Sequence, residues 1–145
     1  MADLVIVDYG AGNVKSVEFA LNRLGVKPIL SSDADVVGNA GRVIFPGVGN
    51  AEFVMNVLKS KGLDDAIKSL KVPVLGICLG MQLMCTRTEE GNVEGLAIFD
   101  TLVNRFPAVN KIPHMGWNSN KTNGNPIFKG IPEESYFYFV HSYFA

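Results

Sequence analysis

The sequence predicts an α/β domain with a mostly parallel sheet, helices on both faces and a few added antiparallel strands. In the first two thirds of the chain, short and nearly continuous apolar runs alternate with segments of helical spacing, as in repeated strand–helix units. After about residue 95 the pattern becomes alternating and aromatic, with turn residues between the runs, which is typical of strands. A length of 145 residues suits one domain better than two, so we expect residues 1–145 to form a single domain.

The first half of the chain supplies most of the predicted parallel sheet. A strand at 4–7 ends at Asp8 in a Gly-rich turn, and a helical pattern then runs to Gly25. A second strand, at 28–30, begins with a proline that places it near an edge of the sheet. A third strand, at 43–45, is predicted to end at Pro46 and Gly47. Two helical patterns follow, and then a buried strand at 74–77.

The last third of the chain carries no long helical pattern. Residues 101–106 and 136–144 are predicted strands, and residues 118–132 are rich in turn residues. Residues 113–118 are predicted to form a loop. Together with the earlier elements, this pattern indicates a flavodoxin-like architecture in which a smaller antiparallel or mixed set of strands is added to the parallel sheet.

The composition excludes several classes of function. A net charge of −1 without a basic run argues against a nucleic-acid partner. No apolar run resembles a signal peptide or reaches membrane-spanning length, so we expect a cytoplasmic protein without a membrane partner. Cys78 and Cys85 are predicted on one turn-plus-helix segment, roughly 10 Å apart and too distant for a disulfide. No cluster of metal-ligand residues appears, and neither a metal nor an organic cofactor is expected.

The Gly10-Ala11-Gly12 turn after the first strand has only part of a dinucleotide-binding fingerprint. The third glycine is missing, and Asp33 or Asp35 is a weak match to the ribose-binding acid. A tight strand-to-helix turn with Asn13 as the helix N-cap explains the segment better.

The segment around Cys78 carries the strongest chemical signal. A short apolar strand runs directly into Cys78, which is flanked by Gly76 and Gly80, and an apolar helical pattern follows. This is the thiol form of the nucleophile elbow, where side chains at the glycine positions would collide. The N-terminus of the helix favours thiolate, and the Leu79 N–H is placed to bind a developing oxyanion. The alternative is a buried structural cysteine.

A glycine-rich segment and one glutamine are predicted to lie beside the elbow. Gly47, Val48 and Gly49 follow the third strand at the carboxyl edge of the predicted sheet, where open α/β sheets bind ligands. An amide of Val48 or Gly49 would supply a second oxyanion donor, although an ordinary Gly/Pro loop would have the same sequence. Gln82 lies one helical turn after Cys78 and is either an exposed amide or a substrate ligand.

The motif around Cys78 resembles the nucleophile motif of class I (triad) glutamine amidotransferases. Three more segments narrow the resemblance to the glutaminase subunits of imidazole glycerol phosphate synthases: Asp8–Asn13, Pro46–Gly49 and His114–Asn118. The resemblance implies that Cys78 attacks L-glutamine and that ammonia passes to a cyclase subunit, a (β/α)8 barrel, in histidine biosynthesis. It implies oxyanion donors at Gly49 and Leu79, substrate contacts at Gly47, Val48 and Gln82, and a partner interface at Asn13, Trp117 and Asn118.

The resemblance also sets expectations about the base. Similar proteins carry their catalytic His and Glu in a His-Pro-Glu segment, and this sequence has only His114 and His141. We therefore expect a domain that lacks its C-terminal segment and has little activity alone. Three alternatives remain: the glutaminase part of another synthase, such as those that make anthranilate or GMP; a cysteine hydrolase or chaperone on the same scaffold; and a non-catalytic binding subunit.

Overall fold

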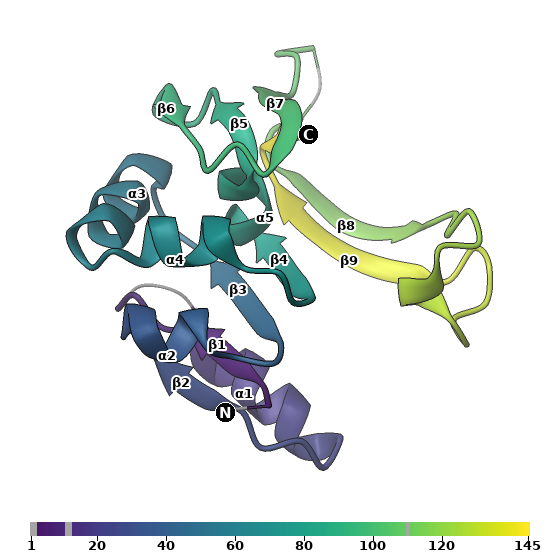
Figure 1. Ribbon diagram of the computed structural model, residues 1–145. Coiled ribbons are helices and arrows are strands. Elements are labelled where there is room, and N and C mark those ends of the chain that lie inside the picture. The colour runs from purple at the N-terminus through teal and green to yellow at the C-terminus, as the bar shows by residue number, and fades with distance from the viewer. Residues whose placement is uncertain (1–2, 11–12, 110) are drawn as a thin grey trace.

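A four-stranded parallel sheet lies at the centre of the computed structural model, which describes residues 3–10, 13–109 and 111–145 (Figure 1). Its strands are β1 (Val5–Val7), β2 (Ile29–Ser31), β3 (Val43–Gly47) and β4 (Val74–Cys78), in the order β2-β1-β3-β4. All three pairings are parallel. This order is that of flavodoxin-like sheets, so the predicted fold class is confirmed, and β2 lies at the edge as Pro28 predicted.

Helices cover both faces of this sheet. They are α1 (Val14–Arg23), α2 (Ala34–Gly38), α3 (Ala51–Ser60), α4 (Leu63–Ser69) and α5 (Leu79–Met84). Helix α1 packs through Val14 on Ile6 and Ile44, whereas the larger core on the other face contains side chains from α2, α3, α4 and α5. Helix α2 was not predicted from the sequence. Asp33 begins it by accepting hydrogen bonds from the Asp35 and Val36 N–H groups, so Asp33 is an N-cap.

Strand β3 runs through the predicted break at Pro46 and Gly47. β1 pairs with β3 only at Val43 and Ile44, so a proline further along β3 removes no donor that β1 needs. The hydroxyl of Tyr9 donates to the Pro46 carbonyl at 3.0 Å. The ladder with β4 meanwhile continues to the pair Gly47–Cys78, so the prediction that the strand stops at Phe45 is wrong.

Strand β4 is less buried than its apolar sequence predicts. Leu75 and Ile77 are exposed, whereas Phe45 on the neighbouring strand is buried. Among the strands that the structure describes, β4 lies at one edge of the parallel sheet. The buried residues that pack under α1 come from β1 and β3, so this cluster does not cover β4. The prediction of a buried strand at 74–77 is therefore wrong: Val74 and Gly76 are half-buried, and Leu75 and Ile77 are exposed.

A second, mixed sheet follows α5. It contains β5 (Cys85–Thr88), β6 (Val93–Glu94), β7 (Phe99–Arg105) and β10 (Tyr143–Phe144), with β5 and β7 parallel and the other pairs antiparallel. Helix α5 ends at Met84, so Cys85 lies on a strand and not on the helix that we predicted. The carbonyls of residues 83–86 accept hydrogen bonds from the N–H groups of residues 95–98, which takes them out of the helical pattern.

The remaining strands form a long antiparallel hairpin, β8 (His114–Ser119) with β9 (Tyr136–His141), which projects from the body of the molecule (Figure 1). The prediction of a loop at 113–118 is wrong, because this segment pairs residue by residue with the aromatic strand β9. The connection includes a 3₁₀ turn, Pro126–Phe128. Thr122 donates to the Glu133 carboxylate through its hydroxyl and its N–H, and these bonds lower the pKa of Glu133.

Candidate active site

Cys78 lies on a strained turn between β4 and α5. Its φ is +53°, a left-handed value that costs a non-glycine residue energy. A Cβ at Gly76 would lie 2.7 Å from Met81 Cα, and one at Gly80 would lie 1.9 Å from the Phe45 carbonyl oxygen. Both glycines are therefore required by close backbone approach, as the elbow interpretation predicted. The turn leaves Cys78 exposed.

The register between β3 and β4 brings the Pro46–Gly49 segment beside this elbow. Gly47 pairs directly with Cys78, and a Cβ on Gly47 would lie 2.5 Å from the Gly80 nitrogen. Gly49 has a φ of +104°, which only glycine adopts without strain. The two segments are thus adjacent because the strands are parallel and in register.

A cavity of about 300 Å³ opens at this junction. It is lined by Val48, Gly49, Cys78, Leu79, Gln82, Glu90, Pro113, Val140, His141, Ser142 and Tyr143. Five of the six residues predicted to bind or activate glutamine therefore share one cavity. The sixth, Gly47, lies behind them and lets β3 approach α5. Leu79 is the first residue of α5, so its N–H has no acceptor within the helix.

Gln82 is buried, with 5% of its surface exposed, and it faces this cavity. Its Oε1 accepts no hydrogen bond from any residue that the structure describes. A buried carbonyl oxygen without a donor costs free energy, and this oxygen is itself closed to solvent although other atoms of Gln82 line the cavity. The interpretation of Gln82 as an exposed amide is therefore wrong.

Sequence reasoning gave no role to Glu90 or to residues 140–143, which line the same cavity. Glu90 is half-buried, and burial raises its pKa above the usual value for a glutamate. A cationic group beside this half-buried carboxylate would stabilise its ionised form. The signal in the sequence was weak, because Glu90 is one of two adjacent glutamates and only the fold distinguishes them.

Cys85 differs from the exposed Cys78 in its burial. It is 1% exposed, its Sγ lies 3.6 Å from the Met81 carbonyl oxygen, and burial raises its pKa. A buried thiol of raised pKa is a poor nucleophile. The structure therefore separates the two cysteines as the sequence predicted, one exposed at the turn and one in the core.

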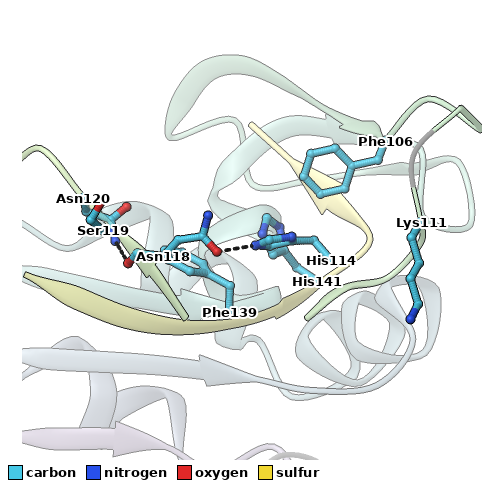
Figure 2. A pocket seen from close by; sticks show the side chains of 8 residues that line it. All are labelled: Phe106, Lys111, His114, Asn118, Ser119, Asn120, Phe139 and His141. Carbon is cyan, nitrogen blue, oxygen red and sulfur yellow. Dashed lines mark hydrogen bonds between the residues drawn. The ribbon is translucent and has the colours of Figure 1, made fainter. Parts of the chain in front are cut away.

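The two histidines lie close together, with ring centroids 5.5 Å apart. His141 Nδ1 donates to the Tyr143 carbonyl at 2.8 Å, and His114 Nε2 donates to Asn118 Oδ1 at 3.1 Å. Figure 2 shows both rings at a second cavity, of about 560 Å³, between the hairpin and Phe106. Of the two, only His141 also lines the Cys78 cavity.

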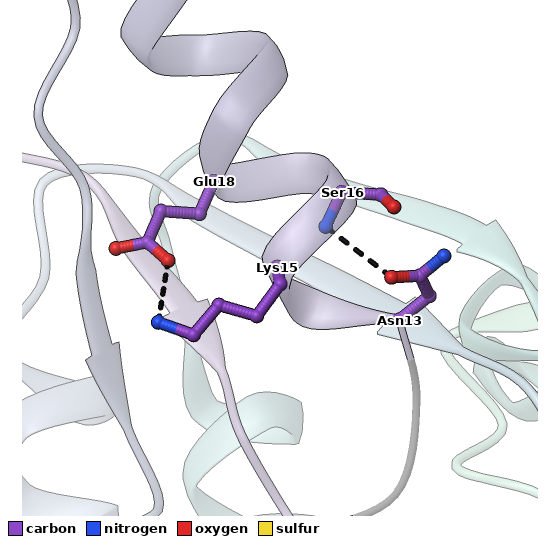
Figure 3. Close-up of polar contacts among 4 residues, drawn as sticks. All are labelled: Asn13, Lys15, Ser16 and Glu18. Carbon is purple, nitrogen blue, oxygen red and sulfur yellow. Dashed lines mark hydrogen bonds and ion pairs between the residues drawn. The ribbon is translucent and has the colours of Figure 1, made fainter.

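The three residues predicted at a partner interface lie on two separate elements. Asn13 caps α1 by accepting a hydrogen bond from the Ser16 N–H (Figure 3). Trp117 and Asn118 are neighbours on β8, and neighbouring strand residues point to opposite faces. Trp117 is 66% exposed beside Tyr138, whereas Asn118 lines the second cavity. Ala11 and Gly12 of the same predicted motif lie outside the described residues.

The described residues form neither a metal-ligand cluster nor a membrane-spanning helix. Residues 3–10, 13–109 and 111–145 contain no group of three or more His, Cys, Asp or Glu side chains that could hold a metal ion. In the same part of the chain, no helix is long and apolar enough to cross a membrane.

A parallel α/β sheet with a cysteine at its nucleophile elbow is typical of a class of enzymes that use a thiol nucleophile, and comparison with known proteins identifies the family. Residues 5–145 match the family described as "Glutamine amidotransferase class-I", and the chain belongs to this family. Among its relatives is "Imidazole glycerol phosphate synthase subunit HisH" of Bacteroides fragilis, with 52% identity over 98% of this chain and 74% of the relative. The protein of the same description from Yersinia pestis is 46% identical over 97% of this chain and 74% of its own length.

Two solved structures share the fold at low sequence identity. A structure described as "glutamine amidotransferase" superposes with a TM-score of 0.73 and 15% identity, covering 96% of this chain and 70% of that one. A "putative gmp synthase subunit a protein" from Thermoplasma acidophilum gives a TM-score of 0.67 and 23% identity, covering 99% and 66%.

Proposed function

We propose that this protein hydrolyses L-glutamine to glutamate and ammonia through a thioester on Cys78, and that the ammonia supplies the cyclase subunit of imidazole glycerol phosphate synthase in histidine biosynthesis. The observation that carries the proposal is the cavity that joins the strained Cys78 turn, the Val48–Gly49 segment and the buried Gln82 side chain. Identity of about 50% to HisH proteins favours this synthase over those that make anthranilate or GMP.

The chemistry begins with the Cys78 thiolate. Its sulfur attacks the carboxamide carbon, and the carbonyl electron pair moves onto oxygen. The N–H groups of Leu79 and Gly49 are the proposed donors to that oxyanion, and one such donor is typically worth about 3 kcal/mol. Collapse of the tetrahedral intermediate breaks the carbon–nitrogen bond, and the nitrogen leaves as ammonia with a proton from the histidine of the His-Pro-Glu segment that the resemblance implies; the same histidine then takes a proton from the attacking water. Water then attacks the thioester and restores the thiolate as glutamate leaves.

Two side chains of the cavity are suited to the polar groups of glutamine. Gln82 lines the cavity, and a rotation of its amide would bring the unpaired Oε1, now closed to solvent, to a substrate N–H group and satisfy it. The Glu90 carboxylate would pair with the α-ammonium group of the substrate, because a cation favours the ionised form that burial disfavours. Gly47 contributes indirectly, since its missing side chain brings β3 close enough to present Val48.

The docking of the cyclase is proposed on the face of the hairpin that carries Trp117. An exposed tryptophan beside Tyr138 offers the large aromatic surface that dominates many interfaces. Asn13 at the start of α1 is proposed at the same interface, and Asn118 at its border, because its side chain points to the other face. The two free thiols fit the reducing cytoplasm in which we place the protein.

The test is ammonia release from glutamine by the protein extended through the His-Pro-Glu segment that the resemblance implies, together with its cyclase subunit; the 145-residue chain alone should release little. Cys78→Ser should abolish turnover, whereas Cys85→Ser, a matched change at the buried thiol, should leave the rate within a few fold. Release of ammonia by Cys78→Ser at the wild-type rate would refute the proposed chemistry.

A further inference from the structure

Tyr9 occupies a position that the proposed chemistry does not use. It follows β1 at the carboxyl edge of the sheet, where only 2% of its surface is exposed. Its ring packs edge-on against Phe45, with centroids 6.1 Å apart, so the direction of its hydroxyl is fixed by the core. That hydroxyl points at β3, and it donates to the Pro46 carbonyl at 3.0 Å.

The same hydroxyl oxygen also meets the segment beyond Gly47. Burial raises the pKa of Tyr9 to about 12, partly offset by a backbone hydrogen bond from Val48 and raised a little further by the nearby Cys78. The hydroxyl therefore keeps its proton at every pH at which the protein would be assayed. It donates to the Pro46 carbonyl, and its oxygen also lies near the Val48 N–H on the other side of Gly47.

The segment between these contacts needs such a restraint. Gly47 and Gly49 have no side chains to anchor them. The φ of Gly49 is only one of many backbone conformations open to a glycine, so other contacts must hold it there. The far end of the segment is fixed by Asn50, whose side chain accepts from the Phe53 N–H and begins α3. Tyr9 supplies the matching restraint at the near end.

We propose that Tyr9 is a positioning residue for the oxyanion hole: its hydroxyl fixes the backbone around Gly47, and thereby the direction in which the next amides face the Cys78 cavity. Tyr9 does not touch the substrate and is not a catalytic residue. This inference rests on the proposed function, because it assigns a role within that oxyanion hole. Its effect should appear in the transition state, where the oxyanion forms, and not in the binding of glutamine.

The test variant is Tyr9→Phe, which keeps the ring against Phe45 and removes only the hydroxyl. We expect kcat to fall roughly three- to tenfold, as for one hydrogen bond, with KM within twofold. Thr86→Val is the matched control, because it removes a hydroxyl that donates to a backbone carbonyl, that of Phe99, outside the cavity. Thr86→Val should keep the wild-type kcat.

Two further measurements separate positioning from a general loss of structure. An aldehyde analogue of glutamine, which forms a tetrahedral adduct with Cys78, should bind Tyr9→Phe three- to tenfold more weakly. Glutamine itself should bind Cys78→Ser equally well with and without Tyr9→Phe. Amide hydrogen exchange at Val48 and Gly49 should be faster in Tyr9→Phe, while the exchange of core amides in α3 is unchanged.

The outcomes distinguish this inference from the proposed function. An unchanged or raised kcat in Tyr9→Phe, or a loss confined to KM, would overturn the role of Tyr9 while leaving an inactive Cys78→Ser to support the glutaminase. An active Cys78→Ser would overturn the glutaminase itself. If Tyr9→Phe melts far below Thr86→Val and all core amides exchange faster, Tyr9 is a structural residue and the inference is wrong.

Discussion

Adding one methyl group at Gly80 tests whether the elbow is held by backbone contact. The new Cβ would lie 1.9 Å from the Phe45 carbonyl oxygen and 2.8 Å from its carbon, and both are backbone atoms of a buried strand. Neither β3 nor α5 can yield cheaply, so overpacking should cost about 3 kcal/mol, the upper part of the usual range. Alanine regains about 1 kcal/mol in a helix, which leaves Gly80→Ala less stable by about 2 kcal/mol.

The matched control is Gly38→Ala at the end of α2. Its Cβ would meet nothing within 4 Å, and its backbone is not left-handed. It should therefore be neutral or up to about 1 kcal/mol more stable than wild type. The assay is urea unfolding followed by circular dichroism, with thermal melting in parallel.

At roughly 3 °C per kcal/mol for a chain of this size, Gly80→Ala should melt about 6 °C below wild type. Glutaminase turnover should fall further than stability explains, because the clash moves the Cys78 turn away from β3. If both variants had equal stability and activity, the close approach of α5 to β3 would not exist, and the geometry derived for the site would be wrong.

Three other outcomes follow from the site. Glu90→Gln should raise the KM for glutamine at least tenfold and remove the acidic limb of the pH profile of kcat/KM. In wild type this limb should lie above the usual glutamate range, because burial raises the pKa of Glu90 and only its ionised form pairs with ammonium. An acidic limb that persists in Glu90→Gln would contradict this role. Trp117→Ala should weaken cyclase binding by about 2 kcal/mol in calorimetry, while Phe53→Ala, a change at another exposed aromatic residue, on α3, should not; equal effects would remove Trp117 from the interface. His141→Asn, which keeps a donor for the Tyr143 carbonyl, should retain turnover within about tenfold, because the resemblance places the base in the His-Pro-Glu segment; a loss as complete as that of Cys78→Ser would make His141 the base.

The parts of the site that the sequence predicted are those in which local covalent geometry decides the outcome. The glycines around Cys78 and in the Pro46–Gly49 segment are demanded by tight backbone approach, and such demands are visible as residue types. The strands and longer helices of the parallel sheet were likewise visible from their spacing. Helix α2 was missed because five residues are too few to show a period.

The parts that were missed depend on contacts distant in the sequence. The end of α5 at Met84 is set by residues 95–98, and β8 is a strand because β9 pairs with it. Glu90 and Tyr9 acquire their roles only when the fold brings them beside Cys78 and Pro46. The local spacing of residues in the sequence does not predict contacts of this kind.

Trapping the covalent intermediate tests the central claim most directly. The protein, with its cyclase subunit, would be mixed with glutamine, quenched in acid within one turnover, digested and analysed by mass spectrometry. We predict a γ-glutamyl adduct on the peptide that contains Cys78, absent from the peptide that contains Cys85 and lost in Cys78→Ser. Turnover of glutamine with no adduct on Cys78, or with the adduct on Cys85, would contradict the account.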